Sequence, residues 1–173
     1  MLLAQLCVGR IILWGDSKSV GVGWVANGKN STSINQIREK DTRKIVFQTS
    51  AESSYAEWGW QWAPWSPNFR GTDFRSFNTL DVEFRLLGPR PPSDVSISLA
   101  SPGDHRTTER LSIKSAINVI PIGKWCCIKM PLDKFPNPAG RYDAEHTIQL
   151  IFGTWNGKGG KFSFEVRKIA IRH

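Results

Sequence analysis

Apolar and polar residues alternate with a period of two along most of this chain, and helical periodicity is nearly absent. In the segment 80–86, the apolar residues Leu80, Val82, Phe84 and Leu86 alternate with charged ones. The same alternation recurs over 95–99, 111–114, 125–130, 148–152 and 162–166, and shorter strand-like stretches cover 11–14, 44–49 and 55–62. The pattern predicts nine or ten strands, each with one face in a shared core.

Breaks rich in glycine and proline separate these strands at 88–92, 101–104, 136–140 and 156–160. None is long enough to be a linker between domains. The short stretch 72–77 is the one helical candidate. Two antiparallel sheets packed face to face bury this many half-apolar strands most simply. We therefore predict an all-β fold, a two-sheet antiparallel β-sandwich of the jelly-roll kind, as a single domain over 1–173, with 1–9 as a leader or disordered start.

Tryptophan is unusually frequent, with eight Trp and nine Phe against two Tyr. Trp58, Trp60 and Trp62 share one face of a strand, and Glu57 and Gln61 lie on the other. In one interpretation these indoles fill the core. In the other they form flat platforms on which pyranose rings stack while polar groups bind the sugar hydroxyls.

Other aromatic residues stand in loops or at strand ends, where exposed rings on a stiff scaffold often contact ligands. These are Trp24, Trp65 and Trp155. Polar residues on the outer faces of strands, among them Glu83, Arg85 and Gln149, supply hydrogen-bonding groups wherever they lie on the concave sheet. The residues expected to contact carbohydrate are Trp24, Trp58, Trp60, Trp65, Glu83, Arg85, Gln149 and Trp155.

The net charge of +8 allows an acidic or a neutral partner. The basic residues are spread along the chain without a run of five or more, so we expect no nucleic-acid partner, while an anionic polysaccharide fits the charge as well. Cys126 and Cys127 are adjacent, which argues against a disulfide framework, and the scattered histidines argue against zinc.

The opening sixteen residues are partly apolar but lack the basic start, long apolar centre and cleavage site of a secretory signal. No stretch reaches the roughly eighteen apolar residues of a membrane span. We expect a chain that does not enter a membrane.

Several segments, in order, resemble carbohydrate-binding modules with a galactose-binding-domain-like jelly roll. They are Ile12-Leu-Trp14-Gly-Asp16, Gly23-Trp24, Tyr55-Ala-Glu-Trp58-Gly-Trp60, 74–84, Lys124-Trp125, Met130-Pro-Leu132-Asp-Lys-Phe135, Phe152-Gly-Thr-Trp155 and 164–171. The resemblance spans nearly the whole chain and is carried by the order of the segments.

This resemblance implies non-catalytic binding of β-glucan, mannan, xylan or a similar plant or algal glycan. It further implies an extracellular place within a larger protein, as an accessory to a glycoside hydrolase or lyase. Many members hold a structural calcium through acidic residues near the first and last strands. Here Asp16 is available, but Arg167 and Lys168 stand where acids are expected, which argues against calcium and leaves no cofactor expected.

Catalysis by a jelly-roll polysaccharide lyase or glycoside hydrolase is the alternative, because this fold also carries such enzymes. A glycosidase needs two carboxyl groups about 5 to 10 Å apart, for which Glu57 and Glu83 are candidates. A lyase needs a Tyr or His base among polar neighbours, and this chain has few of either residue. We therefore expect a binding protein and not an enzyme.

Overall fold

The computed structural model describes residues 9–15, 21–27, 32–39, 42–49, 55–63, 71–87, 95–103, 106–117, 121–155 and 162–173. The predicted leader lies almost wholly outside these residues, and only its last residue, the exposed Gly9, is described. Within the described part, no helix is both long and apolar enough to span a membrane.

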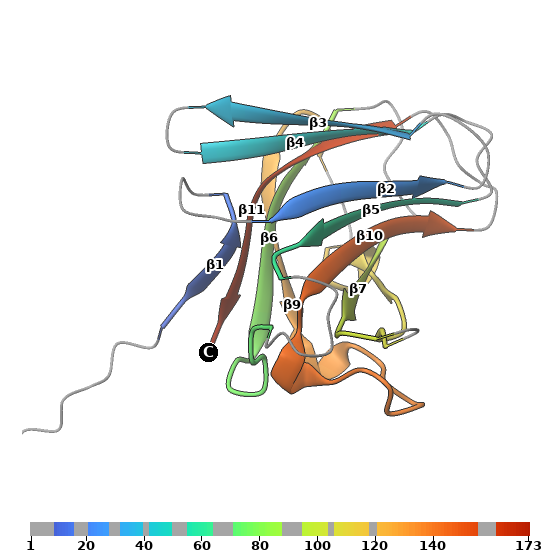
Figure 1. The fold of residues 1–173 in the computed structure, drawn as a ribbon. Coiled ribbons are helices and arrows are strands. Elements are labelled where there is room, and N and C mark those ends of the chain that lie inside the picture. Colours follow the sequence, from blue (N-terminus) through green and yellow to red (C-terminus); the bar gives the residue numbers. More distant parts are fainter. Residues whose placement is uncertain are drawn as a thin grey trace, which may run out of the picture.

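The described residues form eleven strands in two sheets, and every strand pair is antiparallel (Figure 1). One sheet has the order β3-β4-β11-β6-β9, with β1 also paired to β11, and the other has the order β2-β5-β10-β7-β8. The predicted two-sheet antiparallel β-sandwich is confirmed. The strands are β1 (Ile11–Trp14), β2 (Val22–Asn27), β3 (Thr32–Glu39), β4 (Thr42–Thr49), β5 (Tyr55–Gln61), β6 (Thr79–Leu86), β7 (Ser96–Ala100), β8 (Leu111–Ser112), β9 (Trp125–Pro131), β10 (Gln149–Trp155) and β11 (Phe162–Arg172).

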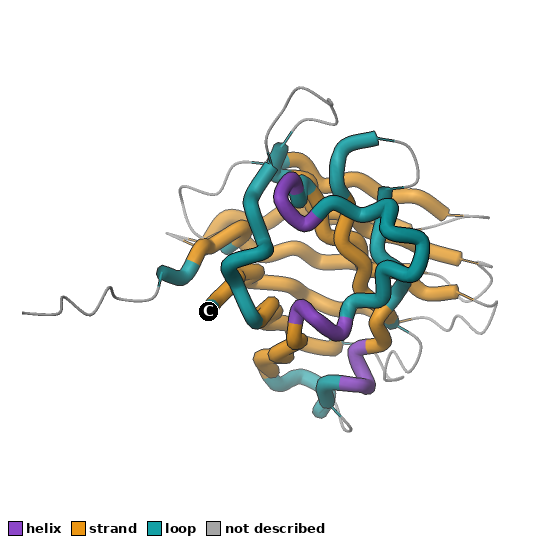
Figure 2. Tube along the Cα trace, turned by 90° about the horizontal axis from the view of Figure 1, so that it is seen from below, coloured by secondary structure: helices purple, strands orange, loops and turns teal. Residues whose placement is uncertain are grey.

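Three short 3₁₀ helices complete the described elements: Ile113–Ser115, Leu132–Lys134 and Ala144–His146. Figure 2 shows these helices and the longer loops gathered over one side of the strands. The connections therefore add a layer of irregular backbone that can surround a site on the sheet beneath it.

Two segments differ from their predicted elements for local reasons. The segment 72–77 forms a turn, because the carboxylate of Asp73 accepts a hydrogen bond from the Arg75 amide at 2.9 Å and offers the backbone an alternative to a helix. The strand predicted over 111–114 ends at Ser112, whose hydroxyl accepts a hydrogen bond from the Lys114 amide and begins a 3₁₀ helix. The strands β2 and β3 lie where no strand was predicted.

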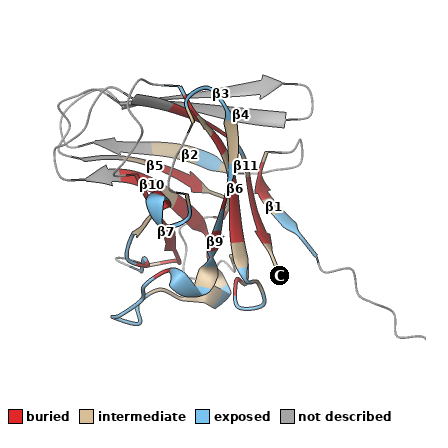
Figure 3. Ribbon diagram, turned by 180° about the vertical axis from the view of Figure 1, so that it is seen from behind, coloured by how far each residue is buried: buried red, intermediate tan, exposed pale blue. Residues whose placement is uncertain are grey.

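The core fills the space between the sheets with the inward-facing residues of the strands (Figure 3). Trp60 of one sheet meets Trp14 of the other edge to face, with ring centres 4.1 Å apart. Phe152 stacks on Trp58 at 5.0 Å and reaches Phe164 across the sandwich at 5.8 Å. These contacts hold the two sheets in a fixed relation, so their outer faces are stiff surfaces.

A β-bulge interrupts β11 where it crosses β6. Val166 pairs with Phe84 and Lys168 pairs with Glu83, so Arg167 is the additional residue. The bulge packs against Gly15, which has a φ of +114°. A Cβ added to Gly15 would lie 2.2 Å from the Arg167 carbonyl oxygen, so a larger residue does not fit there. The end of β1 is therefore fitted to the bulge.

Candidate functional site

A row of four residues crosses the outer face of the five-stranded sheet. Trp24 on β2 pairs with Gly59 on β5, Gly59 pairs with Ile151 on β10, and Ile151 pairs with Ser98 on β7. These positions alternate with the buried Trp58, Trp60, Leu150 and Phe152, so they face away from the core. Across the sheet, the row therefore presents an aromatic side chain, a glycine without a side chain, an apolar side chain and a hydroxyl group.

Glycine at position 59 determines how Trp24 lies. A Cβ at Gly59 would be 2.1 Å from Cε2 of the Trp24 indole, so the ring occupies the space above β5 that any side chain would fill. The indole therefore lies against the sheet and is half-buried there. A half-buried ring held in this way is a rigid apolar platform at the surface of the sheet.

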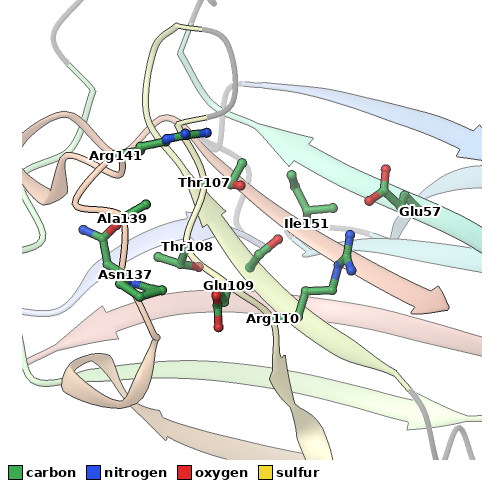
Figure 4. A pocket seen from close by; sticks show the side chains of 11 residues that line it. Glu57, Thr107, Thr108, Glu109, Arg110, Asn137, Ala139, Arg141 and Ile151 are labelled. Carbon is green, nitrogen blue, oxygen red and sulfur yellow. The ribbon is translucent and has the colours of Figure 1, made fainter.

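A pocket of about 580 Å³ opens on the same face, next to this row. Its floor consists of Glu57, Ser98 and Ile151 of the sheet, and its walls are the loop segments 107–110 and 137–141 (Figure 4). Threonine, serine and asparagine side chains line it together with two arginines and two glutamates. The pocket is therefore a polar hollow beside an aromatic platform.

The first wall is fixed by hydrogen bonds to β7. The Thr108 amide donates to the Leu99 carbonyl oxygen at 2.9 Å, and the Leu99 amide donates to the Thr108 hydroxyl at 3.0 Å. The Glu109 amide donates to the carbonyl oxygen of Pro136 at 2.7 Å, which ties this wall to the segment leading into the second.

The second wall is closed by one asparagine side chain. The Asn137 amide nitrogen donates to the Tyr142 carbonyl oxygen at 3.0 Å, and its oxygen accepts from the Tyr142 amide at 3.2 Å. Gly140 turns the loop with a φ of +62°. Both walls are consequently positioned before any ligand arrives, which reduces the entropy lost on binding.

Glu57 and Arg110 give the pocket its electrostatic character. Their side chains extend into the same part of the pocket (Figure 4). Burial raises the pKa of the Glu57 carboxyl, and the positive charge of Arg110 partly opposes this rise. Burial likewise lowers the pKa of Arg110, and Glu57 opposes that change. The pocket can therefore both donate to and accept from sugar hydroxyls.

The expectation that Trp58 and Trp60 contact sugar is corrected by the structure. Both side chains are 0% exposed and pack in the core, where the Trp60 indole donates to the Leu13 carbonyl oxygen at 3.1 Å. Trp62, next in the alternation, lies beyond the end of β5 and donates to the Thr147 carbonyl oxygen. The first interpretation of this aromatic strand, as core, therefore applies to Trp58 and Trp60.

Glu83 and Arg85 lie on the outer face of the six-stranded sheet, on the opposite side of the sandwich from the pocket. Each is held in an ion pair there, with Arg167 and Glu165 respectively. The structure thus does not bring them together with Gln149, which belongs to the other sheet and is 3% exposed. Glu57 and Glu83 are likewise on opposite faces and cannot act as a carboxylate pair.

The remaining predicted residues have different outcomes. Trp24 lies within β2 and not in a loop. Trp155 is the last residue of β10 and pairs with Tyr55, and its side chain is outside the described residues. Trp65 also lies outside them. The sequence suggests Glu57 only as half of a carboxylate pair with Glu83, and it does not predict Arg110 or the two wall segments, because loops carry no periodic signal.

A structural calcium does not fit the last strand. Arg167 donates to Glu83 at 2.8 Å, and its neighbour Lys168 also offers a cation no oxygen. Among the described residues, no group of three or more His, Cys, Asp and Glu side chains is placed to hold a metal ion. Asp16 lies outside the described residues.

Comparison with solved structures places the fold among the carbohydrate-binding modules. The family 30 carbohydrate-binding module of a cellulosomal cellulase of Clostridium thermocellum matches 94% of this chain over 96% of its own, at 15% identity and a TM-score of 0.66. The family 11 module of the same organism, solved with a β-1,3-1,4-mixed-linked tetrasaccharide, matches 95% of this chain over 96% of its own, at 16% identity and a TM-score of 0.64. The jelly-roll fold and the predicted structural resemblance to these modules are confirmed.

A larger enzyme contains a similar domain. The β-1,2-glucanase of Parabacteroides distasonis matches 95% of this chain over 22% of its own, at 15% identity and a TM-score of 0.59. This chain therefore corresponds to about one fifth of that enzyme. A scan of the sequence against family models finds no match, and neither does a search of curated protein sequences.

Proposed function

We propose that this chain is a non-catalytic polysaccharide-binding module that holds a neutral β-glucan against the outer face of its five-stranded sheet. The observation that carries the proposal is the Trp24 indole, packed over Gly59 beside a preformed polar pocket. A pyranose ring stacks on such a platform through its C–H face, while the pocket exchanges hydrogen bonds with its hydroxyls. The common fold with family 11 and family 30 modules supports the same function.

Polar complementarity favours a neutral chain at this site. Glu57 on the floor and Glu109 in the wall accept hydrogen bonds, while Arg110 and Arg141 donate them, so the charged groups of the pocket balance. A chain of hydroxyl groups can satisfy both kinds of partner. A chain bearing a carboxylate on every sugar would bring that charge close to Glu57.

The pocket's carboxylates support binding over hydrolysis. Glu57 and Glu109 both line it, but in Figure 4 the Glu109 side chain is directed away from Glu57. A glycosidase needs its two carboxyls to flank one bond. We infer that the module is an accessory to a glycan-degrading enzyme outside the cell, in line with the β-1,2-glucanase in which a similar domain forms part of a longer chain.

Affinity electrophoresis in gels containing mixed-linked β-glucan tests the proposal. The unmodified protein is expected to be retarded, and Trp24→Ala is expected to lose most of the retardation, by tenfold or more in affinity on the order of the stacking contribution of one aromatic ring. Trp125→Ala is the matched control, because Trp125 is also half-buried but lies on the other sheet. Equal loss in the two variants would contradict the assignment.

The same glucan incubated with the protein distinguishes a binding module from an enzyme. No new reducing ends and no unsaturated uronide absorbance are expected after prolonged incubation. Product formation that Glu57→Gln abolishes would replace the proposal with hydrolysis in the pocket.

A further inference from the structure

A second cluster of aromatic and charged side chains lies on the face opposite the pocket. We call it the Trp125 cluster; it consists of Trp125 on β9, Glu83 and Arg85 on β6, and Glu165 and Arg167 on β11. Strand alternation turns these residues away from the core, since Val82, Phe84 and Val166 between them are buried. The function proposed above makes no use of this cluster.

Two guanidinium groups are fixed over one indole in this cluster. Their central carbons lie 4.9 Å (Arg85) and 4.5 Å (Arg167) from the centre of the Trp125 ring, within the range of cation–π attraction. Arg85 Nε donates to Glu165 at 2.7 Å, and Arg167 Nε donates to Glu83 at 2.8 Å. Each guanidinium is thus held by a ring and by a carboxylate, which preorganises both.

The bulge in β11 produces this arrangement. Arg167 is the additional residue between the paired positions Val166 and Lys168, and its side chain leaves the strand out of step with the regular alternation. In a strand without a bulge, the residue directly after Val166 would pair with Glu83. Here Lys168 pairs with Glu83, and Arg167 is added between Val166 and Lys168. The bulge adds a cation to the face without removing one.

The cations of this face are more exposed than the carboxylates that they pair with. The arginine side chain is 28% exposed against 5% in the Arg85–Glu165 pair, 45% against 23% in the Arg167–Glu83 pair, and 39% against 2% in the Arg172–Asp81 pair. Cations also outnumber carboxylates among the outward positions of β6, β9 and β11, which carry Arg85, Lys129, Arg167, Lys168 and Arg172 against Asp81, Glu83 and Glu165. The part of this face that β6, β9 and β11 offer to solvent is therefore positive.

The guanidinium groups retain donors for a ligand. A guanidinium carries several N–H groups. Arg85 donates through Nε and Nη2 to Oε2 of Glu165, and Arg167 donates through Nε to Oε2 of Glu83, so both keep further N–H groups. Its planar fork matches a carboxylate with two parallel hydrogen bonds. Two such forks over one ring, on a face where Lys129, Lys168 and Arg172 add further positive charge, suit an anionic group.

We propose that the Trp125 cluster is a second binding site, which takes the carboxylate of a uronate-bearing polysaccharide on the face opposite the proposed β-glucan site. The choice of a polysaccharide over an acidic protein rests on the function proposed above, because a site for an acidic sugar on this face would extend the polysaccharide binding proposed for the other face. The site itself rests on the forks, the ring and the positive surface. One module would then join a neutral and an acidic glycan from its two sides.

The test uses variants that leave the net charge unchanged. Replacing both ion pairs with amides, as Arg85→Gln with Glu165→Gln and Arg167→Gln with Glu83→Gln, removes the forks without leaving a buried carboxylate unpaired. In gels containing polygalacturonate, this variant is expected to lose tenfold or more in affinity while its retardation by β-glucan is unchanged. Arg167→Lys, at an exposed position, keeps the charge without the fork, and a several-fold loss is expected even if the larger variant folds poorly.

A charge control separates a built site from general attraction. Arg75→Gln with Arg106→Gln removes two exposed positive charges elsewhere on the surface and is expected to weaken polygalacturonate binding less than twofold at physiological salt. The inference is overturned if the unmodified protein ignores polygalacturonate, if the charge control loses as much as the amide variant, or if polyglutamate is bound equally well. The Trp24→Ala protein should still bind polygalacturonate, so failure of the β-glucan site and failure of this site give different results.

Discussion

The tryptophans at positions 24 and 60 are opposite in exposure although their strands are neighbours. Trp60 pairs with Gly23 and turns inward, and Trp24 pairs with Gly59 and turns outward. Gly59 leaves room for the Trp24 indole, and the Trp60 indole lies against Gly21, where an added Cβ would be 2.6 Å from its Cζ2. The two rings occupy neighbouring positions of the same strand pair, and a difference of one position places a side chain on the opposite face of the sheet.

Trp60→Phe should lower the free energy of unfolding by about 1–3 kcal/mol, because the Leu13 carbonyl oxygen would lose its buried donor and the ring contact with Trp14 would shrink. Denaturant unfolding followed by circular dichroism measures this loss. Binding of β-glucan by the folded variant should be unaltered. A variant of unchanged stability that no longer binds glucan would show that the ring contacts the ligand after all.

Glu57 should make stability depend on pH in the direction opposite to that of an ordinary paired carboxylate. Its pKa is raised in the folded state by burial, so the folded protein holds this proton more tightly than the unfolded chain does. The free energy of unfolding should therefore fall as the pH rises from the unfolded value of about 4.5 through the raised folded value. In Glu57→Gln this decline should be smaller, measured by urea unfolding at a series of pH values.

Glu109→Gln is the control for that series, because it removes an exposed carboxyl from the same pocket. Its unfolding curve should keep the decline of the unmodified protein. An equal change in the two variants would mean that burial of Glu57 is not the cause.

The sequence could predict that aromatic and polar side chains form the site, but it could not predict on which face of the sheet each of them lies. Trp24 was among the predicted contacts and lies beside the pocket, whereas Trp58 and Trp60 were predicted contacts that fill the core. Alternation shows that Glu57 and Trp58 face opposite ways, yet it does not show which way is inward when both faces of a strand carry large side chains. Only the partner sheet decides this.

At the level of elements, β1 depends on Gly15 to meet the bulge of β11. Gly15→Ala should cost about 1–3 kcal/mol or more in the free energy of unfolding, because alanine is strained at a φ of +114° and its Cβ would collide with the Arg167 carbonyl. Gly9→Ala is the control, since nothing lies within 4 Å of the added carbon. Chemical denaturation of both variants checks the difference, and equal stability of the two would contradict this account of the junction.

Most strands could be predicted because their alternation is regular and their ends carry turn residues. β6 is the clearest case, with four buried apolar residues at every second position. β2 and β3 were not predicted, since Val22-Gly-Trp-Val-Ala-Asn27 contains a glycine and Thr32–Glu39 is largely polar. Pairing with β5 and β4 makes strands of them, and pairing between distant segments leaves no local pattern.

For the whole molecule, the two sheets present different chemistry to opposite sides. The outer face of one carries a platform and a charge-balanced pocket, and that of the other carries cations over buried carboxylates. Ring contacts such as Trp58–Phe152 and Phe152–Phe164 fix the two sheets against each other. A ligand can therefore bind to one face without movement of the other face.

Ligand binding should therefore stabilise the folded protein by mass action without a change of shape. At a glucan concentration about one hundred times the dissociation constant, the gain is roughly 2.7 kcal/mol, which should raise the melting temperature by several degrees. Differential scanning calorimetry with and without mixed-linked glucan measures it. Trp24→Ala, with tenfold lower affinity, should gain only about 1.4 kcal/mol at the same glucan concentration. A rise of equal size in that variant would place the glucan elsewhere.

Gly59 also bears on how such a protein can diverge. As long as an indole lies across β5, every larger residue at position 59 is excluded, so the two positions are expected to be inherited together. A descendant that gains a side chain at 59 must first give up the ring packed there by Trp24. Among related sequences, the pair would then mark which lineages kept this aromatic platform and which turned the same sheet to another use.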